Sequence, residues 1–157
     1  MRIQAHLNPR CLEDVFIELP VEAGEGLGLC GKLVHWLYGF RKAASEWERF
    51  YARTLEDVGF QRGAACPVLL YHPHKDIAMA VHGDDFVLCG LEEDLRWAAG
   101  HIQQSFEVKI RAVIGEEEGD DKEAVVLGRT VRWRSWGIEY EAHGRHRQAL
   151  LDEVGFG

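Results

Sequence analysis

The amino-acid sequence predicts an α+β fold, in which an antiparallel sheet carries helices packed on one face. Short apolar runs separated by turn residues indicate strands, and stretches with helical periodicity lie among them. Their order never gives the regular βαβ alternation of a parallel sheet. Two apolar runs flank Gly83-Asp84-Asp85, which indicates a hairpin. The 157 residues, 46% hydrophobic and 28% charged, are typical of one soluble domain, and no domain boundary or internal repeat is visible.

The first elements are a strand, a loop and a helix. Residues 15–19 form an apolar run that Pro20 stops, which indicates a strand. Residues 22–31 carry four glycines and two acids, a composition typical of turns and loops. Residues 43–58 show helical spacing, and Gly59 is placed to end that helix. Its apolar stripe is expected to comprise Trp47, Phe50, Tyr51, Leu55 and Val58.

The rest of the chain continues this mixture of strands and helices. The residues 72–76 form a turn between two apolar runs, and an acidic loop separates two later runs. We expect strands at residues 68–71, 77–81, 86–89, 108–113, 124–133 and 137–140, and helices at 91–106 and 143–154.

The charge distribution limits the classes of partner. The formal net charge is −8, from 18 Lys and Arg against 26 Asp and Glu, which argues against a free-standing nucleic-acid binder. Locally the pattern differs, because residues 129–147 hold five arginines and two acids, whereas residues 116–121 hold five acids. A basic face beside an acidic loop and an ordinary solvated surface both remain open.

The cysteines and the apolar runs predict the compartment. Cys11, Cys30, Cys66 and Cys89 lie far apart and form no Cys-x-x-Cys pair, so we expect buried thiols in a reducing environment. No charged-then-apolar leader opens the sequence, and no apolar run approaches bilayer-spanning length. We expect an intracellular protein, cytoplasmic or nuclear and not secreted, with no membrane contact.

Asp84-Asp85 is the feature that points most clearly to chemistry. Two adjacent ionised carboxylates repel each other, so a tight hairpin tolerates them in water or beside cations. Mg²⁺ prefers carboxylate oxygens and keeps positions open for phosphate. A pair of such ions can activate a hydroxyl and stabilise a leaving pyrophosphate. Gly-Asp is also ordinary turn chemistry, so the pair alone is compatible with a purely structural turn.

The surrounding residues resemble the reverse transcriptase of copia-type retrotransposons. The segment from Lys32 to Trp47 is similar to the family pattern K-L-x-x-x-L-Y-G-L-K-Q-A-P-R-x-W. Leu55 with Gly59-Phe60 is similar to L-x-x-x-G-F, and Asp84-Asp85 falls where that family has Y-V-D-D. Further matches, in order along the chain, are Ala5, Leu7, Asn8, Glu13, Val15, Pro20, Pro67, Leu127, Gly128, Gly137, Ile138, Leu150, Leu151 and Gly155.

This resemblance implies a reverse-transcriptase palm-like fold and an RNA-directed DNA polymerase, a nucleotidyltransferase that uses two metal ions. Asp84 and Asp85 would be the catalytic carboxylates and the ligands of Mg²⁺ or Mn²⁺. The partners would be an RNA or DNA primer-template and deoxynucleotides. The residues expected to face nucleotide or nucleic acid are Tyr38, Gly39, Arg41, Lys42, His82 and Gly83.

The chain also departs from the family pattern. In the family, a catalytic aspartate lies four residues before the alanine that is matched by Ala5. The corresponding residue here is Met1, so by this alignment the third catalytic carboxylate is missing. His82-Gly83 replaces Tyr-Val, and Ala44-Ser45 stands where proline and arginine are usual. Fingers, most of a thumb and the RNase H region have no counterpart. We therefore expect a palm-region fragment that is inactive by itself.

Two other functional readings stay open from the sequence. One is a degenerate remnant that folds without catalysis and binds nucleic acid or nothing. The other is an unrelated α+β binding or signalling domain with an acidic hairpin. Among the remaining candidates, His72-x-His74 is either a metal pair or, as we expect, a solvated turn, and His143 with His146 is expected at the surface. The aromatic residues of the helical region are expected in the core: Trp36, Trp47, Phe50 and Tyr51.

Overall fold

The computed structural model describes residues 7–23, 28–141 and 144–155 and has the predicted α+β character, with helices and antiparallel sheets. The chain divides into two compact units, Met1–Lys109 and Ile110–Gly157, which we call the first and the second unit. The sequence shows no composition change at this boundary, and the assignment of the whole chain to one domain stays a prediction.

The first unit is built on a four-stranded antiparallel sheet. Its strands follow the chain in the order β3 (Gln61–Arg62), β4 (Leu69–His72), β5 (Ile77–His82) and β6 (Asp85–Cys89). Each strand pairs with the next one, so the sheet is a meander joined by short turns. The predicted strands at 68–71, 77–81 and 86–89 are therefore confirmed to within a residue.

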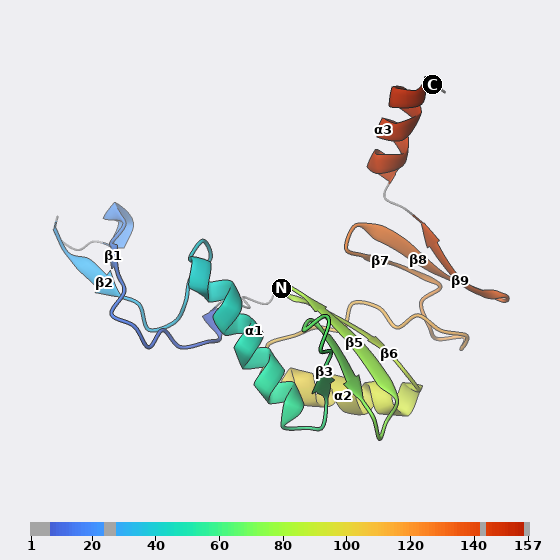
Figure 1. Ribbon diagram of the computed structural model, residues 1–157, viewed down its shortest axis with the longest axis horizontal. Helices are drawn as coiled ribbons and strands as arrows, with labels where there is room; N and C mark the ends of the chain where they lie inside the picture. Colours follow the sequence, from blue (N-terminus) through green and yellow to red (C-terminus); the bar gives the residue numbers. More distant parts are fainter. Residues whose placement is uncertain (1–6, 24–27, 142–143, 156–157) are drawn as a thin grey trace. The chain divides into compact units, whose positions relative to one another are not determined.

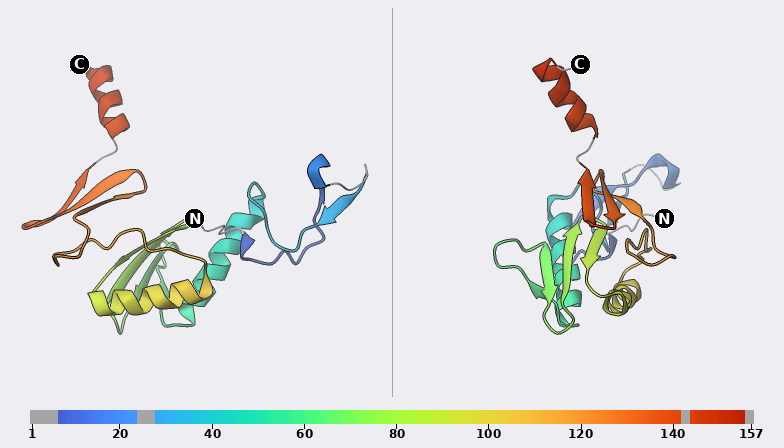
Figure 2. Two further views of the ribbon diagram at one scale, coloured as in Figure 1. Left: turned by 180° about the vertical axis from the view of Figure 1, so that it is seen from behind. Right: turned by 90° about the vertical axis from the view of Figure 1, so that its right-hand side faces the viewer.

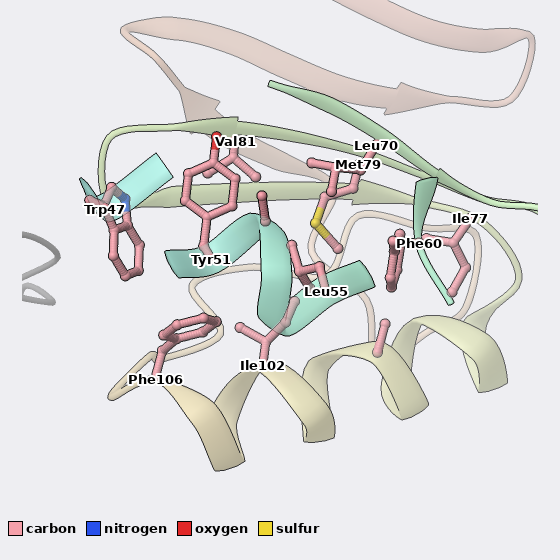
Figure 3. Packing of buried hydrophobic residues seen from close by; sticks show 12 residues of the cluster. Trp47, Tyr51, Leu55, Phe60, Leu70, Ile77, Met79, Val81, Ile102 and Phe106 are labelled. Carbon is pink, nitrogen blue, oxygen red and sulfur yellow. The ribbon is translucent and has the colours of Figure 1, made fainter. Parts of the chain in front are cut away.

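Two helices, α1 (Arg41–Glu56) and α2 (Glu92–Ser105), pack against one face of this sheet. The views in Figures 1 and 2 show both helices alongside the green strands. Figure 3 shows the core between them, where side chains from α1, α2 and the strands interdigitate. The buried members of this core are Trp47, Tyr51, Ala52, Leu55, Phe60, Leu70, Ile77, Met79, Val81, Ala98, Ile102 and Phe106.

The C-terminal end of α1 is held by a glycine turn. Gly59 has a φ of 102°, a conformation that favours glycine, and the Phe60 N–H donates to the Leu55 carbonyl across it. An added Cβ at Gly59 would lie 2.7 Å from Nε2 of His72, so space as well as φ requires glycine. The predicted role of Gly59 is confirmed.

The N-terminal part of the first unit forms a smaller substructure. A two-stranded ribbon of β1 (Phe16–Glu18) and β2 (Cys30–Lys32) is accompanied by a 3₁₀ turn, η2 (Val21–Ala23). A second small cluster of buried residues comprises Cys11, Leu33, Trp36 and Ala43. It adjoins the N-terminal turn of α1, because Ala43 belongs to that helix.

The second unit contains a three-stranded antiparallel sheet and a helix. The strands are β7 (Glu123–Val126), β8 (Arg129–Arg134) and β9 (Gly137–Glu141), and the helix is α3 (Gly144–Val154). Residues paired across the strands share a face. One face is therefore mostly apolar, whereas the other carries Arg132 and Arg134 with the acids opposite them.

Two predicted strands are wrong in this region. Residues 108–113 form no strand. The Val108 N–H donates to the Phe106 carbonyl, and Val113 bonds with Asp121 of the acidic loop in place of a neighbouring strand. Residues 124–133 are two strands joined by a turn. Leu127 and Gly128 both have positive φ there, 51° and 75°. Leucine rarely takes this conformation, so a turn at this position could not be expected from the residue types.

Other predictions need smaller corrections. Three of the four cysteines are exposed, and only Cys11 is buried as expected. Cys89 is exposed because it occupies an outward position of β6. Phe50, which was expected in the core, is 38% exposed. His143 lies outside the described residues, as do the side chain of His146 and the matched Ala5 and Met1.

Candidate functional site

The Asp84-Asp85 pair lies at the turn between β5 and β6, as the sequence predicted. Gly83 and Asp84 are the two turn residues, and His82 pairs with Asp85 to close the hairpin. Gly83 has a φ of 57°, whereas Asp84 keeps a negative φ. Glycine with positive φ at the first central position is typical of a type II′ turn, which matches the twist of the strands it joins.

The strand alternation decides which face carries Asp85. Phe86 and Leu88 point toward the helices and pack on the core, so Asp85, Val87 and Cys89 lie on the opposite face. Asp84 belongs to the turn itself, and both aspartates are partly exposed. The two carboxylates therefore occupy the end of the sheet, where solvent and a bound cation can reach them.

Trp47 of α1 anchors this turn. Its indole N–H donates to the carbonyl oxygen of Gly83 at 2.8 Å, while its ring is only 2% exposed. The ring also packs edge-on against Phe86 and Phe106, at centroid separations of 6.4 and 5.2 Å. Trp47 is thus a core residue, as predicted, whose polar edge fixes the position of the Asp84 turn relative to α1.

Tyr38 contacts the aspartate pair directly. Its hydroxyl donates toward both carboxylate oxygens of Asp84, at 3.4 Å to Oδ1 and 3.2 Å to Oδ2. Tyr38 lies in a turn that is closed by the Phe40 N–H and the Leu37 carbonyl at 3.4 Å. Gly39 follows it with a φ of 92°, the conformation that a type II turn requires at its third residue.

The structure brings only some of the predicted nucleotide-facing residues together. Tyr38, His82 and Gly83 gather around the aspartates. Lys42 instead pairs with Glu13 at 2.6 Å, and Arg41 is an exposed residue at the first position of α1. No sequence motif predicts the hydrogen bond between Trp47 and Gly83. The available signal was that a buried indole N–H needs an acceptor.

The donor set at the turn suits a weakly held divalent ion. Mg²⁺ is usually bound by one or two carboxylates, with water and substrate phosphates completing its shell, and Asp84 and Asp85 provide two. Within residues 7–23, 28–141 and 144–155, no group of three His, Cys, Asp or Glu side chains could hold a metal ion. The two aspartates alone are therefore two possible ligands and not a complete metal site.

A shallow hollow of about 490 Å³ adjoins the site on the outward face of the sheet. Its lining side chains on that face are mainly apolar and come from β4, β5 and β6: Leu69, Tyr71, Ala78, Ala80, Val87 and Cys89. The row of paired residues on this face ends at His82 and Asp85. The hollow itself does not include the aspartates.

His72 is a core residue and is not part of a solvated turn, which corrects that expectation. It is 5% exposed, with Nε2 donating to the Val58 carbonyl at 3.1 Å and Nδ1 accepting the Lys75 N–H at 3.2 Å. Because both ring nitrogens are hydrogen-bonded to the main chain, His72 has no lone pair for a metal. His74 is exposed.

Basic side chains contact the acidic loop and the glutamates of the sheet in the second unit. Lys122 Nζ donates to the carbonyl oxygens of Gly115, Glu116 and Glu117, at 3.0, 3.0 and 2.7 Å. Arg132 contacts three glutamates, Glu123 at 2.9 Å, Glu139 at 2.9 Å and Glu141 at 2.6 Å. Arg132 therefore does not contribute an unpaired positive charge to a basic face of the second unit.

No protein-family model, curated protein or solved structure matches the chain. Among the described residues, no helix combines the length and the apolar character needed to cross a membrane. The functional assignment therefore depends on the local geometry and on the sequence resemblance.

Proposed function

We propose that the first unit is a reverse-transcriptase palm-like scaffold, in which Asp84 and Asp85 bind a divalent cation, Mg²⁺ or Mn²⁺, for nucleotidyl transfer. The observation that carries this proposal is the placement of Asp84 in a two-residue hairpin turn and of Asp85 directly after it, at the end of an antiparallel sheet that is covered by helices. Both carboxylates are partly exposed there, and the turn is tied to α1 through Trp47.

Each part of the site has a defined task in this proposal. When bound, the divalent ion neutralises phosphate charge in the transfer of a nucleotide to a 3′-hydroxyl. Asp84 and Asp85 would bind the ion at the end of the sheet. The hydrogen bond from Trp47 to Gly83 would keep the turn in position. Since Asp85 lies on the outward face, primer-template and deoxynucleotide would approach from that side.

The second candidate function is a non-catalytic remnant of such an element. The observation that favours it is that the described residues provide two carboxylates at the turn and no third His, Cys, Asp or Glu ligand. In this case the fold persists, but neither ion nor nucleotide binds at the turn.

Ion titration separates the two candidates. We expect Mn²⁺ to broaden the amide signals of residues 82–86 first, because the nearest carboxylates belong to that turn. Asp84→Asn should abolish this broadening. The matched control is Asp76→Asn, which alters the turn between β4 and β5, at φ 49°, where asparagine is well tolerated. Broadening that begins elsewhere, or survives Asp84→Asn, would contradict the proposed ion site and favour the remnant.

A further inference from the structure

Strand β6 forms one edge of the sheet in the first unit. The strand order is β3-β4-β5-β6, so β6 pairs with β5 on one side, and among the described residues no strand pairs with it on the other side. None of its five residues is buried, and Val87 is 37% exposed. An edge strand presents main-chain N–H and C=O groups to which another extended strand can bind.

The hairpin geometry identifies the groups of β6 that point outward. His82 and Asp85 flank the two-residue turn and form a hydrogen-bonded pair. Because hydrogen-bonded and non-hydrogen-bonded pairs alternate, Val87 also bonds to β5, whereas the main-chain groups of Phe86 and Leu88 point away from it. The part of the chain that the structure describes contains no hydrogen-bond partner for these groups. Two N–H donors and two C=O acceptors are thus available along the edge.

The two edges of this sheet differ in their protection. Edge strands are usually blunted by small length, charged side chains, proline or a bulge. The opposite edge, β3, has only two residues, one of which is Arg62. In contrast, β6 pairs with β5 without a break, contains no proline and carries a charge only at Asp85. Such a regular and mainly apolar edge favours pairing with another chain.

A second copy of β6 fits this edge in the antiparallel direction. Centring the pair on Val87 places Phe86 of each copy opposite Leu88 of the other, so that all the outward-pointing groups are hydrogen-bonded. The two-fold axis is perpendicular to the sheet, so the helix-covered faces of both copies lie on the same side. Asp85 falls opposite Cys89 and is separated by about 14 Å along the strands from Asp85 of the other copy, so these like charges do not meet.

This register also extends an apolar row on the outward face. Leu69, Ala80 and Val87 are neighbours on that face across β4, β5 and β6. In the two-fold pair the row continues into the second copy, because Val87 faces Val87 with the Cβ atoms about 4.5–5.5 Å apart. Side-chain contact and main-chain pairing therefore favour the same register.

We propose that two copies of the chain associate through β6, which joins their four-stranded sheets into one continuous antiparallel sheet centred on Val87. This inference goes beyond the proposed function and does not depend on an ion at Asp84. A pair of five-residue strands lies at the small end of interface sizes, below the about 1,000 Å² that is typical of stable complexes. The dimer is therefore a weak one.

The test places charge at the centre of the pairing, and sedimentation equilibrium of the full chain from about 10 µM to about 1 mM measures the association. We expect a monomer–dimer equilibrium for the wild type. Val87→Lys and Val87→Glu should each be monomeric, because like charges would face each other across the two-fold axis. An equimolar mixture of these two variants should associate again, because opposite charges then meet.

The matched control is Leu69→Lys. It places the same charge on the same outward face, at a side chain that is 48% exposed, but on β4 and away from the edge. This variant should dimerise as the wild type does, and amide spectra check that each variant keeps its fold. Loss of association in Leu69→Lys would make the sheet face the interface and would overturn the pairing through β6.

Amide exchange reports on the edge itself. The N–H groups of Phe86 and Leu88 should exchange freely at low concentration and become protected at high concentration, whereas the Val87 N–H should be protected at both. Protection of Phe86 and Leu88 in a monomeric sample would mean that a segment of the same chain covers the edge. That result, a wild type that stays monomeric throughout, or a mixture of the two Val87 variants that fails to associate would each contradict the proposal.

Discussion

At the scale of single residues, hydrogen bonds to the main chain hold the polar groups of two buried side chains, His72 and Trp47. His72 is bonded through both ring nitrogens, and the Trp47 indole is bonded to Gly83. These side chains combine apolar packing with directed polar contacts, which fix both a position and an orientation. His72 lies against the turn at Gly59, and Trp47 is hydrogen-bonded to the turn at Gly83.

The turn at Gly59 provides a residue-scale prediction. Gly59→Ala should lower the free energy of unfolding by about 1–3 kcal/mol, because alanine is strained at positive φ and its Cβ would clash with His72. The matched control is Gly100→Ala inside α2, where a Cβ meets no atom within 4 Å. That change should raise the free energy of unfolding by about 0.5–1 kcal/mol. Urea denaturation measures both free energies; a Gly59→Ala variant that is as stable as Gly100→Ala would contradict both the positive φ and the His72 contact.

At the scale of elements, the sequence predicted those parts whose signals are local. The helical stripe of Trp47, Tyr51 and Leu55 and the hairpin around Gly83 each follow from a short pattern, and both are present. The turn at Leu127 and Gly128 could not be predicted, because leucine at positive φ is imposed by strand pairing. The contacts of Trp47 and Tyr38 with the turn were equally invisible, since they join segments separated by 36 and 46 residues.

The sheet of the second unit depends on ion pairs across its strands. Arg132, on the central strand β8, contacts glutamates of β7 and β9, and Arg134 contacts Glu139 at 2.9 Å. Hydrogen bonds from Arg134 and then Arg132 lower the pKa of Glu139 below its ordinary value of 4.5. Bonds to Glu141, Glu123 and Glu139 raise the pKa of Arg132. The guanidinium of Arg132 thus stays charged throughout the accessible pH range.

These ion pairs predict an acid-sensitive element. Because the pKa of Glu139 is lower in the folded state, its stabilising contribution is present above the ordinary glutamate pKa and is lost as the pH falls through the lowered value. Amide protection factors in β7–β9, which are corrected for the intrinsic exchange rate, should therefore fall as the pH drops below the ordinary glutamate value of 4.5. Arg134→Gln should reduce this pH dependence, whereas Arg129→Gln, which removes an arginine that lies over Tyr140, should leave it intact. An unchanged profile in Arg134→Gln would contradict the assignment.

At the scale of the whole molecule, the net charge of the chain and the proposed ion site have opposite effects on nucleic-acid binding. The formal charge of −8 repels phosphate, whereas a divalent ion at Asp84 and Asp85 would attract it. The acidic loop of residues 116–121 is a competing place for a cation, because it holds five acids and the contacts of Lys122 there are with main-chain carbonyl oxygens. In the proposed function, ion binding at the hairpin turn is the step on which the interaction with nucleotide depends.

The most direct measurement of that step is anomalous diffraction from crystals of the full chain grown with Mn²⁺. We expect an anomalous peak at the β5–β6 turn, about 2.0–2.6 Å from carboxylate oxygens of Asp84 and Asp85. The same crystals of Asp84→Asn should lack the peak. A peak confined to the acidic loop of residues 116–121, or none at the turn, would contradict the divalent-ion site.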